Sequence, residues 1–128
     1  MGTVNEQLVT ELCTSALLSH DINRVLACLS KDAYFYNGPF ETVTGHAAIH
    51  DVIAPILVHR ALEKVEIKNT VSSGEMVMNE RVEAWAKGKV RIQLPIVGIF
   101  TVKGEKIVRW CDYFDGGTAM PFLEALKG

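Results

Sequence analysis

Residues 76–102 read MVMNERVEAWAKGKVRIQLPIVGIFTV, two apolar-rich runs on either side of KGK at 87–89. Valine, isoleucine and aromatic side chains favour extended backbone, and a glycine-centred connection of this length predicts a tight hairpin. KGEK at 103–106 gives the same signal before the run at 107–115. The second half of the chain is therefore predicted to be an antiparallel meander of four strands that begins with residues 61–72.

The rest of the chain is predicted to be mainly helical, because its apolar side chains recur at intervals of three and four residues. We predict helices over 4–20, 21–30, 46–60 and 118–127, a strand over 32–37 and a glycine-bounded loop over 38–45. Helices set apart from antiparallel strands define an α+β fold. We expect residues 1–128 to form a single domain, a curved antiparallel sheet wrapped by helices into a cone with an internal pocket.

The composition narrows the classes of partner. Apolar residues make up 48% of the 128 residues and charged residues 22%, the net charge is −2, and the lysines and arginines are spread along the chain. This composition favours neither nucleic acid nor an anionic membrane as a partner, and no apolar run approaches the length of a membrane span. The amino terminus lacks the basic-then-apolar order of a secretory signal, so we expect a cytoplasmic protein.

The spacing of cysteines and histidines does not favour a disulfide framework or a metal site. The three cysteines are an odd number without a CxxC pair, which fits buried free thiols. His46 and His50 stand four residues apart on a predicted helix, but no third ligand accompanies them. We therefore expect neither a metal nor another cofactor.

The strand predicted over 107–115 carries an acidic side chain among apolar neighbours. If its side chains alternate, one face presents Val108, Trp110, Asp112 and Phe114. A carboxyl group in such surroundings must be paired, hydrogen-bonded or protonated, and each of these changes its acidity. Groups of this kind are typical of catalytic sites, although an aspartate near a strand end also caps turns. We interpret Asp112 as a pocket residue.

The strand predicted over 76–86 places both signs of charge on one face, because Arg81 and Glu83 are two residues apart. If the meander brings this face beside Asp112, the guanidinium bridges two carboxylates. Two linked carboxyl groups can hold different protonation states, one acting as a base on water and the other as an acid on a leaving oxygen. A solvated Arg–Glu pair of little consequence is the alternative.

These residues carry a resemblance to a known family. NERVEAW at 79–85, GIF at 98–100, GEKI at 104–107 and WCDYFD at 110–115 resemble the signature of the limonene-1,2-epoxide hydrolase family. The order of the predicted elements is similar over essentially the whole chain. The resemblance implies the cone-shaped, cystatin-like fold shared with nuclear transport factor 2 and ketosteroid isomerase, and a homodimer. It also implies one-step addition of water to a small hydrophobic epoxide, giving a diol without a metal or cofactor.

The resemblance also implies roles for the charged residues. Asp112 is the expected general base that activates water, and Glu83 is the expected acid that protonates the epoxide oxygen. Arg81 is the expected bridge between these two acids. The family has an aspartate where this chain has Glu83, so the acid side chain here is longer by one methylene. A shift on that scale is large enough to change the rate.

Two further residues are expected to hold the nucleophilic water. The family has a Tyr-x-Asn on its first strand, and Asn37 matches the asparagine. Phe35 occupies the position of the tyrosine and cannot hydrogen-bond the water. Tyr36 would take this role only if a bulge turned it inward, since neighbouring residues of a regular strand face opposite sides.

The remaining lining of the pocket should be apolar, which strengthens each polar contact inside it. The candidates for binding substrate are Trp85, Phe35, Phe40, Leu94, Ile96, Phe100, Trp110 and Phe114. Ordinary core packing is an equally good interpretation of any single one of them.

Three functions are compatible with these patterns. The first is hydration of an epoxide, and the second is an epoxide-opening cyclase or isomerase of a biosynthetic pathway that uses the same acid–base pair. The third is a non-catalytic ligand-binding module, because one fold hosts many functions. The charged set counts against the third, since a simple apolar pocket has no need of buried charge. Proton transfer as in ketosteroid isomerase has less support, because that chemistry does not require an arginine between the acids.

Overall fold

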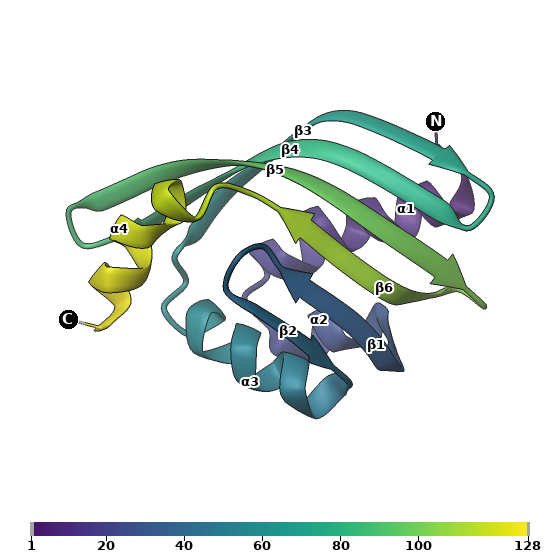
Figure 1. Cartoon of the computed structure of the whole chain (residues 1–128), viewed down its shortest axis with the longest axis horizontal. Helices are drawn as coiled ribbons and strands as arrows, with labels where there is room; N and C mark the ends of the chain where they lie inside the picture. The colour runs from purple at the N-terminus through teal and green to yellow at the C-terminus, as the bar shows by residue number, and fades with distance from the viewer. Residues whose placement is uncertain (1, 128) are drawn as a thin grey trace.

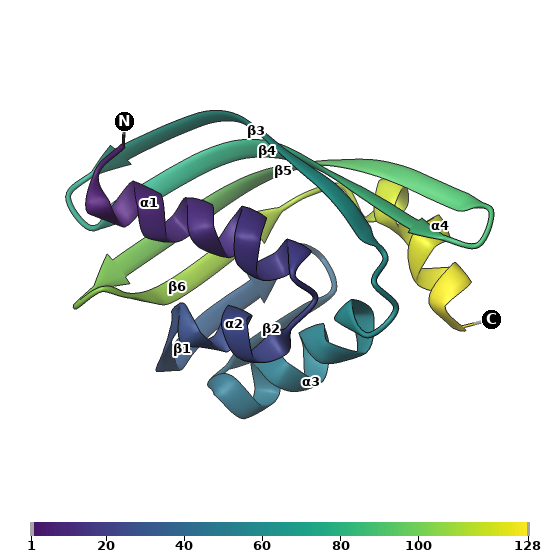
Figure 2. The same ribbon diagram turned by 180° about the vertical axis from the view of Figure 1, so that it is seen from behind.

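The computed structural model describes residues 2–127, which form one curved sheet with helices packed against its inner face (Figures 1 and 2). The strands pair in the order β2-β1-β6-β5-β4-β3. They are β1 Leu29–Asn37, β2 Glu41–Thr44, β3 Leu62–Ser73, β4 Met76–Lys87, β5 Val90–Lys103 and β6 Lys106–Tyr113. The helices are α1 Val4–Glu11, the π-helical segment η1 Leu12–Ala16, α2 Ile22–Ala27, α3 His46–Leu57 and α4 Gly116–Lys127. Within residues 2–127, no helix combines the length and the apolar character that crossing a bilayer requires.

Strands β3 to β6 form the antiparallel meander that the hairpin signals predict, each strand pairing with the next along the chain. Gly88 and Gly104 adopt positive φ angles of 63° and 56° in the two tight connections, where glycine carries no steric penalty. Helices α1, α2 and α3 cover the inner face of this sheet, as Figure 2 shows from behind. The predicted α+β cone is confirmed.

The edge of the sheet beyond β6 differs from the prediction. Strand β1 pairs with β6 in parallel, so the sheet is mixed rather than wholly antiparallel. The predicted loop over 38–45 contains β2, which pairs antiparallel with β1. The prediction was wrong here because the flanking glycines mark a turn but do not report that the Thr-Val-Thr run between them can pair with a neighbouring strand. Strand β1 also begins earlier than predicted, directly after α2.

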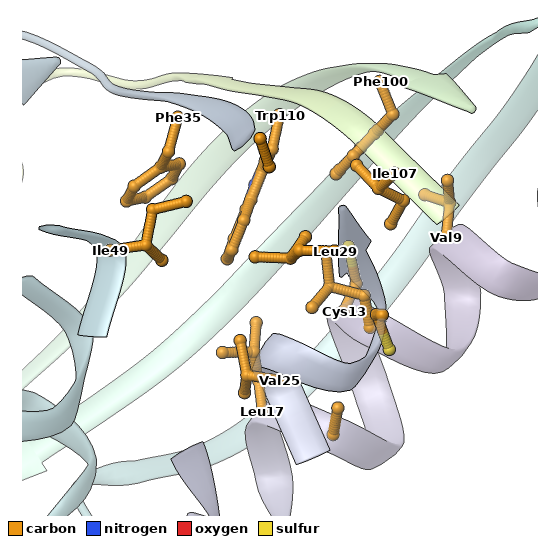
Figure 3. Packing of buried hydrophobic residues seen from close by; sticks show 14 of the residues in the cluster. Val9, Cys13, Leu17, Val25, Leu29, Phe35, Ile49, Phe100, Ile107 and Trp110 are labelled. Carbon is orange, nitrogen blue, oxygen red and sulfur yellow. The ribbon is translucent and has the colours of Figure 1, made fainter. Parts of the chain in front are cut away.

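The core fills the space between the three helices and the inner face of the sheet. Figure 3 shows Val9 of α1, Val25 of α2 and Ile49 of α3 in the same cluster as Phe35 and Trp110 of the sheet. All five side chains are buried, and full burial of a large apolar side chain contributes about 1.5–3 kcal/mol. This contact holds the helices against the concave side of the sheet.

A bulge in β6 changes which of its side chains face this core. The register between β5 and β6 skips Val108, so Ile107 and Trp110 are both buried although they stand three residues apart. The predicted alternation therefore placed Val108 wrongly, and Ile107 takes its place in the core. Beyond the bulge the strand is regular, and Trp110 and Asp112 share the inner face as predicted.

The three cysteines are free and buried, as predicted. The two histidines that stand four residues apart make different contacts. Nε2 of His46 lies 3.0 Å from the backbone oxygen of Leu29, and Nδ1 of the exposed His50 lies 3.5 Å from Oδ1 of Asp51. His46 therefore joins α3 to the start of β1.

Candidate active site

Four polar side chains are buried on the inner face of the sheet: Asn79, Arg81, Glu83 and Asp112. The first three lie on β4 at intervals of two, so they project to the same side. Asp112 of β6 joins them because β5 runs between the two strands and Gly98 lies opposite both Asn79 and Asp112. The sheet thus brings together the three charged residues that the sequence predicts.

Arg81 is the centre of this cluster, and its side chain has no exposed surface. Its Nη2 donates to Oδ2 of Asp112 at 2.7 Å, its Nε donates to Oε2 of Glu83 at 3.0 Å, and its Nη1 donates to Oδ1 of Asn79 at 3.0 Å. Burial acts to lower the pKa of Arg81, but Asp112 and then other neighbours, including Glu83, outweigh it and hold that pKa well above its ordinary value. The guanidinium therefore stays charged and bridges the two acids.

Asn79 was not predicted to belong to the site, although it lies on the same face two residues before Arg81. Its amide oxygen accepts from Arg81, which leaves its Nδ2 to donate to Sγ of Cys13 in η1 at 3.5 Å. Burial raises the pKa of the Cys13 thiol to about 11, so this thiol is neutral beside the cluster. The period of the strand was the signal that could have identified Asn79.

The two acids have different surroundings. Glu83 accepts from Arg81 on Oε2 and from Nε1 of Trp85 on Oε1, the latter at 3.0 Å. Burial raises the pKa of Glu83; Arg81 opposes this shift, and the nearby Asp112 adds to it. Asp112 uses only Oδ2 in its contact with Arg81, and its buried Oδ1 has no hydrogen-bond partner among residues 2–127. One acid is thus biased toward the protonated form, and the other keeps an uncommitted oxygen.

Asn37, at the end of β1, lies opposite Asp112 on one side and Glu41 of β2 on the other. Its Nδ2 donates to Oε1 of Glu41 at 2.6 Å. Because a carboxylate oxygen accepts this hydrogen bond, the Nδ2 end of the Asn37 amide faces Glu41 and the amide oxygen points away from it. Glu41 was not predicted, because its place opposite Asn37 depends on the unpredicted strand β2.

Two cavities, of about 80 Å³ and about 70 Å³, meet at this cluster. Both are lined by Asn37, Ile56, Glu83, Trp85 and Asp112. The first, called the α4-side cavity, is also lined by Phe40, Leu94, Ile96, Phe114 and Phe122. The second, called the α3-side cavity, is also lined by Phe35, Trp110, Leu17, Val52 and Ile53. A larger groove of about 370 Å³ runs along α1 and is lined mainly by polar side chains, but Arg81, Glu83 and Asp112 are not among them.

Seven of the eight predicted substrate-binding residues line one of these two cavities, and Phe100 does not. Phe100 is wholly buried in the main core, with its ring centroid 6.4 Å from that of Trp110, so core packing is the correct interpretation for it. Helices α3 and α4 add Ile56 and Phe122, which the sequence did not identify because helix docking alone brings them to the cluster.

Tyr36 lies on the opposite side of the sheet from the cavities. Strand β1 is regular from Tyr34 to Asn37, and the ring of Tyr36 packs against that of Tyr113 at 5.0 Å between centroids. The bulge that would have turned Tyr36 inward is absent from this part of the strand, so the suggestion that it positions water was wrong. Phe35 faces the α3-side cavity and packs on Trp110 at 4.3 Å.

The fold and the cluster together define a cone-shaped α+β protein with paired acids in a largely apolar pocket. The model of the limonene-1,2-epoxide hydrolase catalytic domain matches residues 4–124, and the chain therefore belongs to this family. One relative is the epoxide hydrolase EphG of Mycobacterium tuberculosis, which is 30% identical over 105 residues. The matched region covers 82% of this chain and 70% of that relative.

Solved structures share this fold. The structure of an LEH-like epoxide hydrolase of M. tuberculosis has a TM-score of 0.78 and 25% identity, covering 97% of this chain and 92% of the other. A SnoaL-like polyketide cyclase from Jannaschia sp. CCS1 also has a TM-score of 0.78, with 14% identity and coverage of 98% and 92%. At that identity the second likeness shows the fold alone.

Gly98 of β5 leaves the space that the Arg81 guanidinium occupies. A Cβ at position 98 would lie 2.7 Å from Nη1 of Arg81 and 2.6 Å from Cε1 of Phe100. Both distances are shorter than van der Waals contact, and both neighbours are themselves buried. The glycine is thus needed for close approach rather than for a turn.

We expect Gly98→Ala to lower the free energy of unfolding by about 1–3 kcal/mol, the usual effect of overpacking a core, as measured by urea denaturation. Gly117→Ala is the matched control. A Cβ at position 117 would meet only Oδ2 of the exposed Asp115, at 3.3 Å, which accepts from Thr118 at the start of α4, so this helical substitution should change stability by less than about 1 kcal/mol in either direction. A Gly98→Ala protein as stable as the unmodified one would contradict the assigned role of Gly98.

The raised pKa of Glu83 also predicts how stability depends on pH. The ordinary value is 4.5, and burial raises it in the folded protein. The folded state therefore binds this proton more tightly than the unfolded state, and the stability gained from it is lost as the pH rises through the folded pKa. A glutamine at position 83 cannot ionise, so the Glu83→Gln protein does not lose stability in this way as the pH rises.

We therefore expect the free energy of unfolding of Glu83→Gln, relative to the unmodified protein, to rise between pH 4.5 and about pH 8. Urea denaturation at the two pH values measures this difference. A constant offset caused by the altered contact with Arg81 cancels in the comparison. A relative stability that stays constant or falls over the interval would show that burial does not disfavour ionised Glu83.

Proposed function

We propose that this protein adds water to a compact apolar epoxide and releases a vicinal diol. The observation that carries the proposal is the buried Arg81, which holds both Glu83 and Asp112 at the junction of two largely apolar cavities. Membership of the limonene-1,2-epoxide hydrolase family supports the same chemistry. A metal is not required for it, because the two carboxyl groups supply both the base and the acid.

In the proposed reaction, Oδ1 of Asp112 accepts a proton from water as the water oxygen bonds to one epoxide carbon. The bond between that carbon and the epoxide oxygen breaks, and protonated Glu83 gives its proton to the departing oxygen. The amide oxygen of Asn37 accepts the second hydrogen of the water, in the orientation that its contact with Glu41 favours. With Phe35 in place of a hydrogen-bonding residue, Asp112 and Asn37 are the two acceptors proposed for this water.

This assignment keeps the charge of the cluster constant. Before the reaction the ionised acid beside the positive Arg81 is Asp112. After the reaction the ionised acid is Glu83. Both carboxyl groups hydrogen-bond the same guanidinium, at 2.7 and 3.0 Å. The negative charge therefore moves from the carboxyl group bound to one nitrogen of Arg81 to the carboxyl group bound to another. The same guanidinium neutralises this charge before and after the reaction, which is a form of preorganised electrostatic stabilisation. A proton returning from Asp112 to Glu83 restores the starting state.

The size and lining of the two cavities support a compact substrate. Each holds only about 70–80 Å³, and their walls away from the cluster are apolar. An epoxide at the junction would extend one small apolar substituent, or one side of a ring, into each cavity.

An epoxide-opening cyclisation is the second candidate, because Phe35 leaves the water with fewer hydrogen-bond partners than the family signature supplies. In that reaction a hydroxyl group of the substrate replaces the water, and the acid and base keep their roles. A non-catalytic binding module is less well supported, because burying an arginine and two acids is costly and an apolar ligand does not need them.

We expect the unmodified protein to convert at least one member of a panel of small cyclic and acyclic epoxides, some of which also carry a hydroxyl group, into a diol, identified by gas chromatography and mass spectrometry. Asp112→Asn should lower kcat by about 10²–10⁴-fold, the usual contribution of a general base. Glu80→Gln is the control, because Glu80 is exposed and projects from the other face of β4. It should retain full activity.

The products separate the candidates. A cyclic ether formed in place of a diol would favour the cyclase, and an absence of turnover over the whole panel would contradict the proposed function. Full activity of Asp112→Asn would remove the base assignment.

The homodimer that the family resemblance implies stays a prediction, and the mass of the protein in solution would test it. The cytoplasmic location also stays a prediction. The outer face of the sheet supports pairing of two copies, because Val71, Met78 and Ile99 lie side by side there across β3, β4 and β5. Val71 is 60% exposed.

A further inference from the structure

Both oxygens of the Glu83 carboxyl group are held from its own strand. Arg81, two residues before it, donates to Oε2, and Trp85, two residues after it, donates from Nε1 to Oε1 at 3.0 Å. Three successive side chains on one face of β4 thus form a chain of hydrogen bonds along the strand. Two donors on different oxygens fix the plane of the carboxyl group as well as its distance from the backbone.

The indole of Trp85 is itself held in place. Its ring packs against Phe122 of α4, with 5.2 Å between centroids and 47° between planes. Its position on β4 lies opposite Leu62 of β3 and Ile92 of β5. Trp85 and Glu83 both line the two cavities, so the bond between them lies where the cavities meet. Helix α4 is therefore connected to Glu83 through one side chain, that of Trp85.

A glutamate needs such support more than an aspartate would. Its longer side chain has one more rotatable bond, and ordering it costs more conformational entropy. The Trp85 hydrogen bond removes this freedom where the acid must reach an epoxide oxygen. An error of about 1 Å in the position of a catalytic group can cost about a hundredfold in rate.

We propose that Trp85 is a positioning residue, which aims the carboxyl group of Glu83 at the epoxide oxygen and stabilises the charge that forms on Oε1 as its proton leaves. This inference rests on the proposed function. Because Oε2 accepts from the permanently charged Arg81, the transferable proton sits on Oε1, beside the indole N–H. When the proton passes to the epoxide oxygen, Oε1 gains negative charge, and a hydrogen bond to a charged acceptor is stronger than one to a neutral acceptor.

The same contact has a consequence for pH. The charged or titratable groups that face Glu83 are Arg81 on β4 and Asp112 on β6, with the neutral thiol of Cys13 from η1 behind Arg81 and Glu41 of β2 beyond Asn37. The side chains from α3, α4 and β5 that share its cavities are apolar. Burial and Asp112 raise the pKa of Glu83, whereas Arg81 and the Trp85 hydrogen bond lower it. Removing the indole N–H should therefore raise this pKa further.

The test is Trp85→Phe, which keeps an aromatic ring against Phe122 and removes the N–H. The reaction requires protonated Glu83, so kcat/KM falls as the pH rises through the pKa of this group. In Trp85→Phe we expect the midpoint of this fall to move up by about one pH unit, the size of effect given by one hydrogen bond to a charged group. We expect kcat to fall about tenfold or more, and KM to change less.

Trp110→Phe is the matched control for the pH midpoint. Trp110 also lines the α3-side cavity, but its buried Nε1 donates to no residue within 2–127. The same substitution at this position should leave the midpoint where it is in the unmodified protein, whatever it does to kcat. A shift of the same size in both variants, or a fall in kcat of Trp85→Phe without a shift, would overturn the proposal, because either result describes altered packing alone.

A titration without substrate separates this proposal from the proposed function. In protein carrying carbon-13 in its glutamate carboxyl groups, the Glu83 resonance is identified by its absence in Glu83→Gln. Its midpoint should be higher in Trp85→Phe than in the unmodified protein. If no epoxide is converted but this midpoint moves, the proposed function fails and the control of Glu83 by Trp85 stands. If diol forms and the resonance does not move, the Trp85 proposal fails alone.

A double-mutant cycle tests the path through Glu83. In a Glu83→Asp protein the shorter acid no longer reaches the indole, so adding Trp85→Phe should change kcat by less than about twofold. A loss as large as in the unmodified background would assign Trp85 to packing and overturn the proposal.

Discussion

A guanidinium with no exposed surface, holding two carboxyl groups, is the interaction on which the rest of the site depends. Burying a single charge costs several kcal/mol unless its partners are near and well oriented, and removing one partner of a buried pair typically costs 3–5 kcal/mol. The surroundings of Arg81 meet this requirement at every nitrogen. Asn79 accepts a hydrogen bond from Nη1 of Arg81, the nitrogen that donates to neither acid. Gly98 leaves the space in which the guanidinium lies. The cluster therefore depends on close packing around the guanidinium as well as on its hydrogen bonds.

The register of the strands places the residues of the cluster next to one another. Glu41, Asn37, Asp112, Gly98 and Asn79 form one continuous row across five neighbouring strands, each residue lying opposite the next. This row sets the proposed base and the amide beside it at adjacent positions, and the acid stands a few residues along β4. Apolar helices then close the pocket, which lowers the local dielectric and strengthens each contact of the row. Rigid strands, rather than loops, thus fix the distances on which proton transfer depends.

The sequence predicted the charged set because a strand has a period of two, so Arg81 and Glu83 had to share a face. Asp112 followed from its apolar neighbours. Residues placed by long-range pairing or helix docking were out of reach: Glu41 depends on a strand hidden in a glycine-bounded segment, and Phe122 reaches the pocket only because α4 folds back on the sheet. The fold class followed from the hairpins, whereas the parallel edge and the bulge in β6 did not, because neither leaves a local pattern.

The central claim is that Asp112 removes a proton from water and does not itself attack the epoxide. One turnover in oxygen-18 water, with the protein in excess over an epoxide that it converts, tests this claim most directly. We predict that the diol carries the heavy oxygen after this first turnover and that the Asp112 carboxyl group remains unlabelled. A first-turnover diol without label, together with label in the carboxyl group of Asp112, would mean that the carboxylate had bonded to the epoxide carbon, and would contradict the claim.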